Sequence, residues 1–123
     1  MAPSQIQIAT SSLQRLLKEE ASYYKEQVQQ EVRIAKLEKE GAGGGADDED
    51  GNREFQLKQE KRALEETKAI IPTIRERITS AREKLESVLD TATNDEERSK
   101  AVEVLKSAKE AQKDDPVAGQ QTS

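Results

Sequence analysis

The chain has 123 residues, of which 37% are charged and 2% aromatic, and its 6 Gly and 3 Pro are too few for a sandwich or barrel of short strands. It contains no His and no Cys, which removes disulfides, thiol nucleophiles, the usual general base near neutral pH and nearly every zinc, haem or iron–sulfur site. Its 20 basic and 25 acidic residues are interleaved and give a net charge of −5, so nucleic acid is excluded as a partner.

The first predicted element is a helix over about residues 11–40, preceded by a frayed end at residues 1–10. Thr10, Ser11 or Ser12 is expected to cap it. A main apolar stripe recurs every ~3.67 positions, close to an 11-residue repeat, and should run almost straight. A second, thinner stripe would serve a second neighbouring helix. The main stripe contains Leu13, Leu17, Ala21, Tyr24, Val28, Val32 and Ala35, and the thinner one contains Leu16, Tyr23 and Ile34.

Residues 41–52, GAGGGADDEDGN, are predicted to form a flexible linker. They resemble a dinucleotide-binding turn at Gly41–Ala46, but the segment follows a helix and runs into acids that repel phosphate. A calcium loop is excluded too, because Ala46 and Leu57 stand where its first and last carboxylates belong.

The second predicted helix covers about residues 53–89 and carries a strict heptad repeat: Leu57, Leu64, Ile71, Ile78 and Leu85. Its companion positions are polar before Pro72 and apolar after it, so the denser packing is expected in the later half. Pro72 lies inside the pattern, where it removes one backbone donor. Because the heptad keeps its phase across Pro72, we expect a kinked but continuous helix and not a break into two.

The third predicted helix covers residues 94–113 and begins at a capping box of Thr93 and Glu96. Ala101, Leu105 and Ala108, with Val102 as a further candidate, form its apolar face. This short helix should pack along the later half of the second helix and the start of the first. The prediction is therefore all-α: a coiled-coil-like three-helix antiparallel (up-down-up) bundle forming one domain, 1–113, with a disordered tail at 114–123.

No pattern points to catalysis, a cofactor or a metal. The acidic residues Glu19, Glu20, Glu26, Glu65 and Glu66 are expected on solvated helix faces. Tyr23 has two readings: its ring packs in the thinner stripe, or it anchors a partner. No run approaches the roughly 18 apolar residues of a membrane span. We therefore expect a soluble, intracellular protein whose partner is another protein and not a membrane.

Two segments resemble a known family. LLKEEASYYKEQVQQE, residues 16–31, is similar to the first helix of the tubulin-specific chaperone A (tubulin-folding cofactor A) family. ETKAIIP, residues 66–72, is similar to that family's second helix, in which a proline after an aliphatic residue is characteristic. The resemblance covers residues 6–110 in order and length and continues after Pro72 at Arg77, Ile78, Leu85, Val88 and Leu89.

This resemblance implies a cytoplasmic, cytoskeleton-associated chaperone without ATP. Such a protein captures β-tubulin released from the cytosolic chaperonin and holds it on the way to the αβ heterodimer, with other tubulin-folding cofactors as further partners. Pro72 would shape the helix and not touch the partner. The residues carried over as partner contacts are Lys18, Glu19, Glu20, Tyr23, Lys25, Glu26 and Arg77.

A coiled-coil adaptor or homodimeric scaffold without tubulin affinity is the alternative. A dimeric coil should continue its apolar seam through Glu60 and Thr67, which the sequence does not do. Internal packing is therefore favoured, while monomer and homodimer both stay open.

Overall fold

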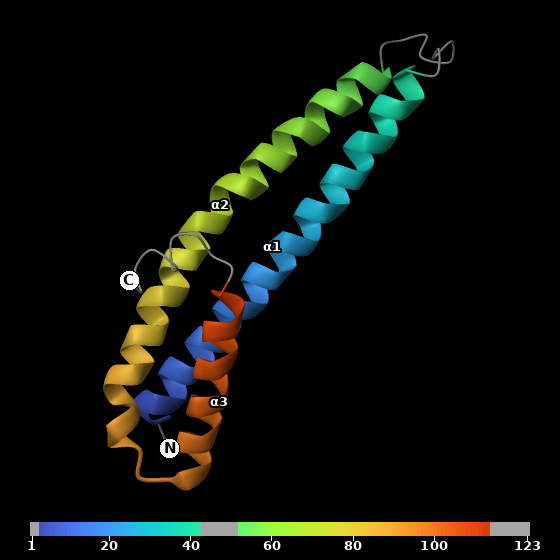
Figure 1. Cartoon of the computed structure of the whole chain (residues 1–123). Coiled ribbons are helices and arrows are strands. Elements are labelled where there is room, and N and C mark those ends of the chain that lie inside the picture. Colours follow the sequence, from blue (N-terminus) through green and yellow to red (C-terminus); the bar gives the residue numbers. More distant parts are fainter. Residues whose placement is uncertain (1–2, 43–51, 114–123) are drawn as a thin grey trace. The chain divides into compact units, whose positions relative to one another are not determined.

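A computed structural model describes residues 3–42 and 52–113 and contains three α-helices (Figure 1). They are α1 (Gln5–Ala42), α2 (Asn52–Val88) and α3 (Asp95–Ala111), with a 3-10 turn η1 (Leu89–Thr91) after α2. These described stretches contain no strand, which confirms the all-α prediction. Most of the predicted linker, at 43–51, and the predicted tail, at 114–123, lie outside the described residues.

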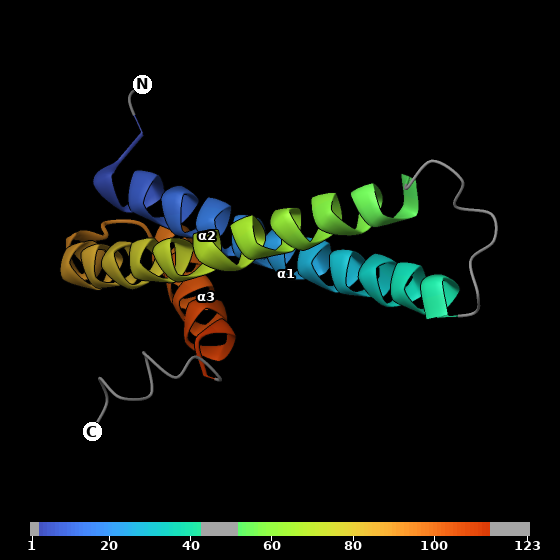
Figure 2. The same ribbon diagram turned by 90° about the horizontal axis from the view of Figure 1, so that it is seen from above.

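The chain divides into two compact units. The bundle unit comprises Met1–Glu20 and Thr73–Ser123, and the hairpin unit comprises Ala21–Pro72. In the bundle unit, α1 and α3 run in one direction and α2 in the other (Figure 1). Figure 2 shows α3 inclined to the two other segments of this unit. The up-down-up bundle is confirmed, with α3 on the predicted parts of α1 and α2.

The heptad predicted for α2 faces the interior. Ile78 and Leu85 are fully buried, Ile71 is buried, and Leu57 and Leu64 are half-buried. The largest fully buried side chains all belong to the bundle unit: Ile6, Leu13, Ile78 and Leu85. Dense apolar packing is thus concentrated where α2 carries apolar residues at both of its heptad positions, as the sequence predicts.

In the predicted main stripe of α1, Leu13 is buried and Leu17 and Tyr24 are half-buried, but the other four positions are wrong. Val28 and Val32 are 60% and 62% exposed, and Ala21 and Ala35 are exposed as well. Most of the buried or half-buried positions follow two long seven-residue repeats and a shorter one: Ile6, Leu13, Glu20, Gln27 and Ile34; Ala9, Leu16, Tyr23, Gln30 and Leu37; and Thr10, Leu17 and Tyr24. Because α2 keeps a strict heptad, its antiparallel neighbour must present a heptad too, even where the residues are polar. The thinner predicted stripe belongs to this set.

The predicted frayed end is also wrong, because α1 begins at Gln5 and Ile6 is only 2% exposed. Ser4 caps the helix: its Oγ accepts from the Gln7 N–H at 3.2 Å, and Gln7 Oε1 accepts from the Ser4 N–H at 3.0 Å. Ser4 Oγ also donates to Glu97 Oε2 on α3 at 3.3 Å. This Ser-x-x-Gln capping box starts the helix six residues before the predicted start.

Removing this cap should destabilise the protein. We expect Ser4→Ala to lower the free energy of unfolding by about 1 kcal/mol, because the Gln7 N–H and the Glu97 carboxylate each lose a hydrogen bond to the Ser4 hydroxyl. Ser12→Ala is the matched control, since Ser12 is exposed inside α1 and was a predicted cap. Urea unfolding followed by circular dichroism measures both. An effect of Ser12→Ala as large as that of Ser4→Ala would place the cap at the later position.

The start of α3 needs a smaller correction. Asn94, and not Thr93, is its N-cap, with Oδ1 accepting from the N–H groups of Glu96 at 2.7 Å and Glu97 at 3.3 Å. Val104 is buried on the inner face, whereas Val102 is 43% exposed. The packed face of α3 is therefore Ala101, Val104, Leu105 and Ala108.

Helix α2 passes through Pro72 without a break, which confirms the predicted continuity. Pro72 has no N–H to donate to the Lys68 carbonyl four residues earlier. It is exposed and is the last residue of the hairpin unit. The kink stays a prediction.

Candidate interaction surfaces

Three of the predicted contact residues lie exposed on the bundle unit. Lys18 and Glu19 belong to α1, and Arg77 belongs to α2. Their charged ends reach solvent from helices whose other faces are buried. These side chains are available to a protein partner without rearrangement of the core.

Glu20 differs from its neighbours, because the structure places it on the buried heptad and not on the solvated face. It is 4% exposed, and its Oε2 lies 3.9 Å from Nε of Arg75 on α2. Arg75 retains 26% of its side-chain exposure. A buried carboxylate needs a positive or hydrogen-bonding partner, so Glu20 joins the two helices in the free protein.

The remaining predicted contacts lie on the hairpin unit. Lys25 and Glu26 are exposed, whereas Tyr23 is half-buried on the inner repeat. A half-buried Tyr23 is compatible with both predictions for it, packing between the helices and contact with a partner. The predicted contact residues are thus divided between the two units.

Polar contacts also line the interior of the hairpin unit. Gln30 is 2% exposed, and its Oε1 has no hydrogen-bond partner among the described residues. Thr67 is buried and donates to the Ala63 carbonyl within its own helix at 3.0 Å. Buried polar groups at heptad positions specify register at a cost in stability. The hairpin unit is accordingly less strongly stabilised by apolar burial than the bundle unit.

Ion pairs on the rim of the hairpin unit join its two helices. Arg33 Nε lies 3.1 Å from Glu60 Oε1, and Lys61 Nζ lies 3.7 Å from Glu38 Oε1. Beside the first pair is an open hollow of about 510 Å³ that includes Leu37 and Phe55, the latter 60% exposed. Exposed ion pairs of this kind contribute ~0–1 kcal/mol each. They therefore add little to the stability of the hairpin unit, although they link its two helices.

The bundle unit has an open hollow of its own, of about 310 Å³, between the start of α1 and the later part of α2. Ile8, which is 54% exposed, is its largest accessible apolar side chain. The complete lining is Gln5, Ile8, Ala9, Ser12, Ala81, Lys84 and Val88. It is a shallow apolar surface with one cation at its edge.

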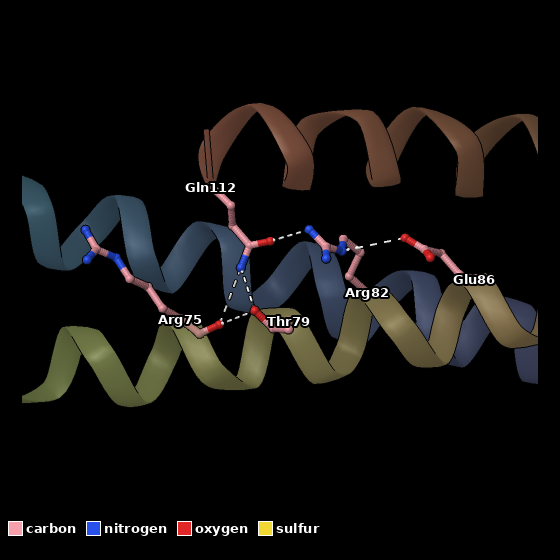
Figure 3. Close-up of polar contacts among 5 residues, drawn as sticks. All are labelled: Arg75, Thr79, Arg82, Glu86 and Gln112. Carbon is pink, nitrogen blue, oxygen red and sulfur yellow. Dashed lines mark hydrogen bonds and ion pairs between the residues drawn. The ribbon is translucent and has the colours of Figure 1, made fainter. Parts of the chain in front are cut away.

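Sequence reasoning missed a polar cluster at the end of α3 (Figure 3). Gln112 is 3% exposed; its Nε2 donates to Thr79 Oγ1 at 2.9 Å, and its Oε1 accepts from Arg82 Nη1 at 2.8 Å. Arg82 Nε in turn lies 3.6 Å from Glu86 Oε1. The cluster fastens the last residues of α3 to α2. Nothing in the local sequence distinguishes Gln112 from the exposed polar residues around it.

The cluster yields a stability prediction. Gln112→Ala should cost about 1–3 kcal/mol of unfolding free energy, because Thr79 and Arg82 lose hydrogen bonds in a partly buried place. Lys113→Ala is the control, since Lys113 is the exposed next residue. Thermal unfolding of the two variants separates the outcomes. Equal melting temperatures would mean that the cluster does not hold α3.

Two findings limit the chemistry of the described residues. Among them, no three or more Asp or Glu side chains come together in a way that could hold a metal ion. None of their helices is long and apolar enough to span a membrane. What the described chain offers a partner is exposed charged helix with scattered apolar side chains.

Comparison with known proteins finds a family model and several relatives. The family model described as "Tubulin binding cofactor A" matches residues 1–112. The chain is 36% identical over 110 residues to "Tubulin-specific chaperone A" of Saccharomyces cerevisiae, covering 89% of this chain and 95% of the yeast protein. It is 32% identical over 93 residues to the mouse protein of the same name, covering 76% and 77%. No solved structure matches the chain significantly.

Proposed function

The chain belongs to the tubulin binding cofactor A family, and we propose that it captures β-tubulin folding intermediates released from the cytosolic chaperonin and passes them on toward the αβ heterodimer. It is a tubulin-folding chaperone and not an enzyme. The observation that carries the proposal is the match to the yeast tubulin-specific chaperone over 95% of that protein's length. The alternative, a scaffold without tubulin affinity, is not favoured by these relatives.

The proposed contacts are exposed or half-buried side chains on the surfaces of folded helices. Mixed charges would steer the encounter and set the register, and a few apolar or aromatic groups would hold the complex. Glu20 is assigned a different part: it holds Arg75 in the free chain. The contacts we propose are Lys18, Glu19, Tyr23, Lys25, Glu26 and Arg77, with Pro72 shaping α2.

The cellular setting follows from the same proposal. A protein that receives β-tubulin from the cytosolic chaperonin works in the cytoplasm, next to the cytoskeleton. It hands its client to other tubulin-folding cofactors. Capture itself needs no ATP, because binding to exposed helix faces involves no chemical step.

A binding measurement tests the proposal. The purified chain is incubated with dissociated tubulin and separated by size-exclusion chromatography, and the α and β subunits are quantified in the fractions that contain it. We expect β-tubulin, and not α-tubulin, to co-elute. The absence of a β-tubulin complex at micromolar concentrations would overturn the proposal. Sedimentation of the free chain in the same buffer distinguishes monomer from homodimer.

A further inference from the structure

A row of exposed residues runs along α1 in the hairpin unit, on the side opposite the buried repeats. Its members alternate four and three positions apart, and all are exposed: Ala21, Lys25, Val28, Val32, Ala35 and Lys39. We call this set the outer row. Alternating spacing of four and three is that of a coiled-coil seam, so α1 carries a second seam that no described residue covers.

The centre of the outer row is apolar. Val28 and Val32 are 60% and 62% exposed and, with Phe55 at 60%, are the most exposed of the described large hydrophobic side chains. β-branched residues are neither the best helix formers nor the usual choice for a solvated helix face. Their spacing is that of residues that pack against a neighbouring helix.

Within the outer row the charged residues are both lysines. Lys25 and Lys39 stand toward the two ends of the outer row, Lys36 flanks it, and no carboxylate occupies the row, although the chain as a whole carries −5. Glu31 flanks the row on its other side, three residues after Val28 and four before Ala35, and is exposed. Glu38 pairs with Lys61 of α2, and Glu31 accepts a hydrogen bond from Gln27 at 3.0 Å.

The outward face of α2 in the same unit is different. Its exposed positions mix both signs, with Lys58 and Arg62 followed by Glu65 and Glu66. Its exposed large hydrophobic side chains, Phe55 and Ile70, stand far apart along the helix. A face that combines an apolar centre with cations at both ends is therefore particular to α1.

We propose that the outer row is the docking surface for an acidic amphipathic helix of the client. Val28 and Val32 pack among the apolar residues of that helix, while Lys25, Lys36 and Lys39 pair with its Asp and Glu side chains. When the client helix packs on the outer row, the valines become buried. The lysines orient the client helix and raise the rate of association. The inference rests on the proposed function, because it places the docking helix in β-tubulin.

The test uses the full chain and β-tubulin from dissociated heterodimer. We expect Val28→Gln/Val32→Gln to raise the Kd at least tenfold, since the variant replaces the apolar centre with polar side chains. Lys25→Gln/Lys36→Gln/Lys39→Gln should weaken binding several-fold and reduce its dependence on salt. Val102→Gln on α3, another exposed valine, and Lys58→Gln/Arg62→Gln on α2 are the matched controls and should bind like wild type.

The outcomes separate this inference from the proposed function. Wild-type chain that binds no β-tubulin overturns the proposed function. Wild type that binds, with both outer-row variants binding equally well, overturns the inference alone. Self-association in sedimentation that Val28→Gln/Val32→Gln abolishes would also overturn it, because a second copy would then cover the row. Circular dichroism confirms that each variant remains helical, and the lysine variant keeps the test valid if the valine variant unfolds.

Discussion

Replacing Leu85 by alanine is expected to lower the free energy of unfolding by about 2–5 kcal/mol. Leu85 is fully buried on the α2 heptad, in the unit that contains all the largest fully buried side chains. Truncation removes apolar burial and leaves a cavity that three packed helices close only in part. Against a total stability of roughly 5–15 kcal/mol for a domain of this size, the loss is large.

The measurement is urea unfolding of the full chain followed by far-ultraviolet circular dichroism. Val102→Ala is the control, because Val102 is 43% exposed on α3, and its cost should stay within about 0.5 kcal/mol. Similar midpoints for the two variants would contradict the packing described for the bundle unit.

Arg75→Ala has the second large expected effect, a loss of about 2–3 kcal/mol. The substitution takes the guanidinium away from a Glu20 carboxylate that is 4% exposed. Removing one partner of a fully buried pair costs about 3–5 kcal/mol, and we expect less here because Arg75 is partly exposed. Glu20→Gln should cost less than Arg75→Ala, since a neutral amide tolerates burial better than a carboxylate that has lost the Arg75 guanidinium.

Arg77→Ala is the matched control, two residues along the same helix and exposed. The stability of this variant should equal that of wild type within about 0.5 kcal/mol. Its affinity for β-tubulin, measured at low salt, should be lower than that of wild type. Thermal unfolding and β-tubulin co-elution, measured on the same preparations, test both halves. A stable Arg75→Ala variant, or an unstable Arg77→Ala variant, would contradict the roles assigned to the two arginines.

The second helix shows how far sequence reasoning reaches. Leu57, Leu64, Ile71, Ile78 and Leu85 recur every seven residues, so one pattern predicted the helix, its inner face and its passage through Pro72. Strong periodicity of large apolar residues carries that information by itself. The two family-like segments, at 16–31 and 66–72, predicted the family in a similar way, because their order and spacing along the chain can be read directly from the sequence.

The first helix shows where the reasoning ends. Its inner repeat contains Glu20, Gln27 and Gln30, while Val28 and Val32 point outward, so counting apolar residues selects the wrong face. The choice is made by the partner helix, whose strict heptad requires a heptad in return. Pairings such as Glu20 with Arg75 depend on residues far apart in the chain, and one sequence does not reveal them.

The true start of α1 can be predicted from local capping chemistry. Ser4-x-x-Gln7 fits a capping box as well as the later hydroxyl residues do. The polar Gln7 between Ile6 and Ile8 favoured a frayed end, yet Ile6 is buried in the bundle unit. The role of Gln112, by contrast, depends wholly on tertiary packing against Thr79 and Arg82.

The proposed function requires that this chain holds β-tubulin and then releases it into heterodimers. A pulse-chase measurement tests it most directly: labelled β-tubulin leaves the cytosolic chaperonin in the presence of the chain, the complex is isolated, and α-tubulin and the other cofactors are then added. We predict that label first co-elutes with the chain without ATP and then moves into αβ heterodimer while the chain is recovered unchanged. Label that never enters the complex, or that stays in it after the chase, would contradict the account.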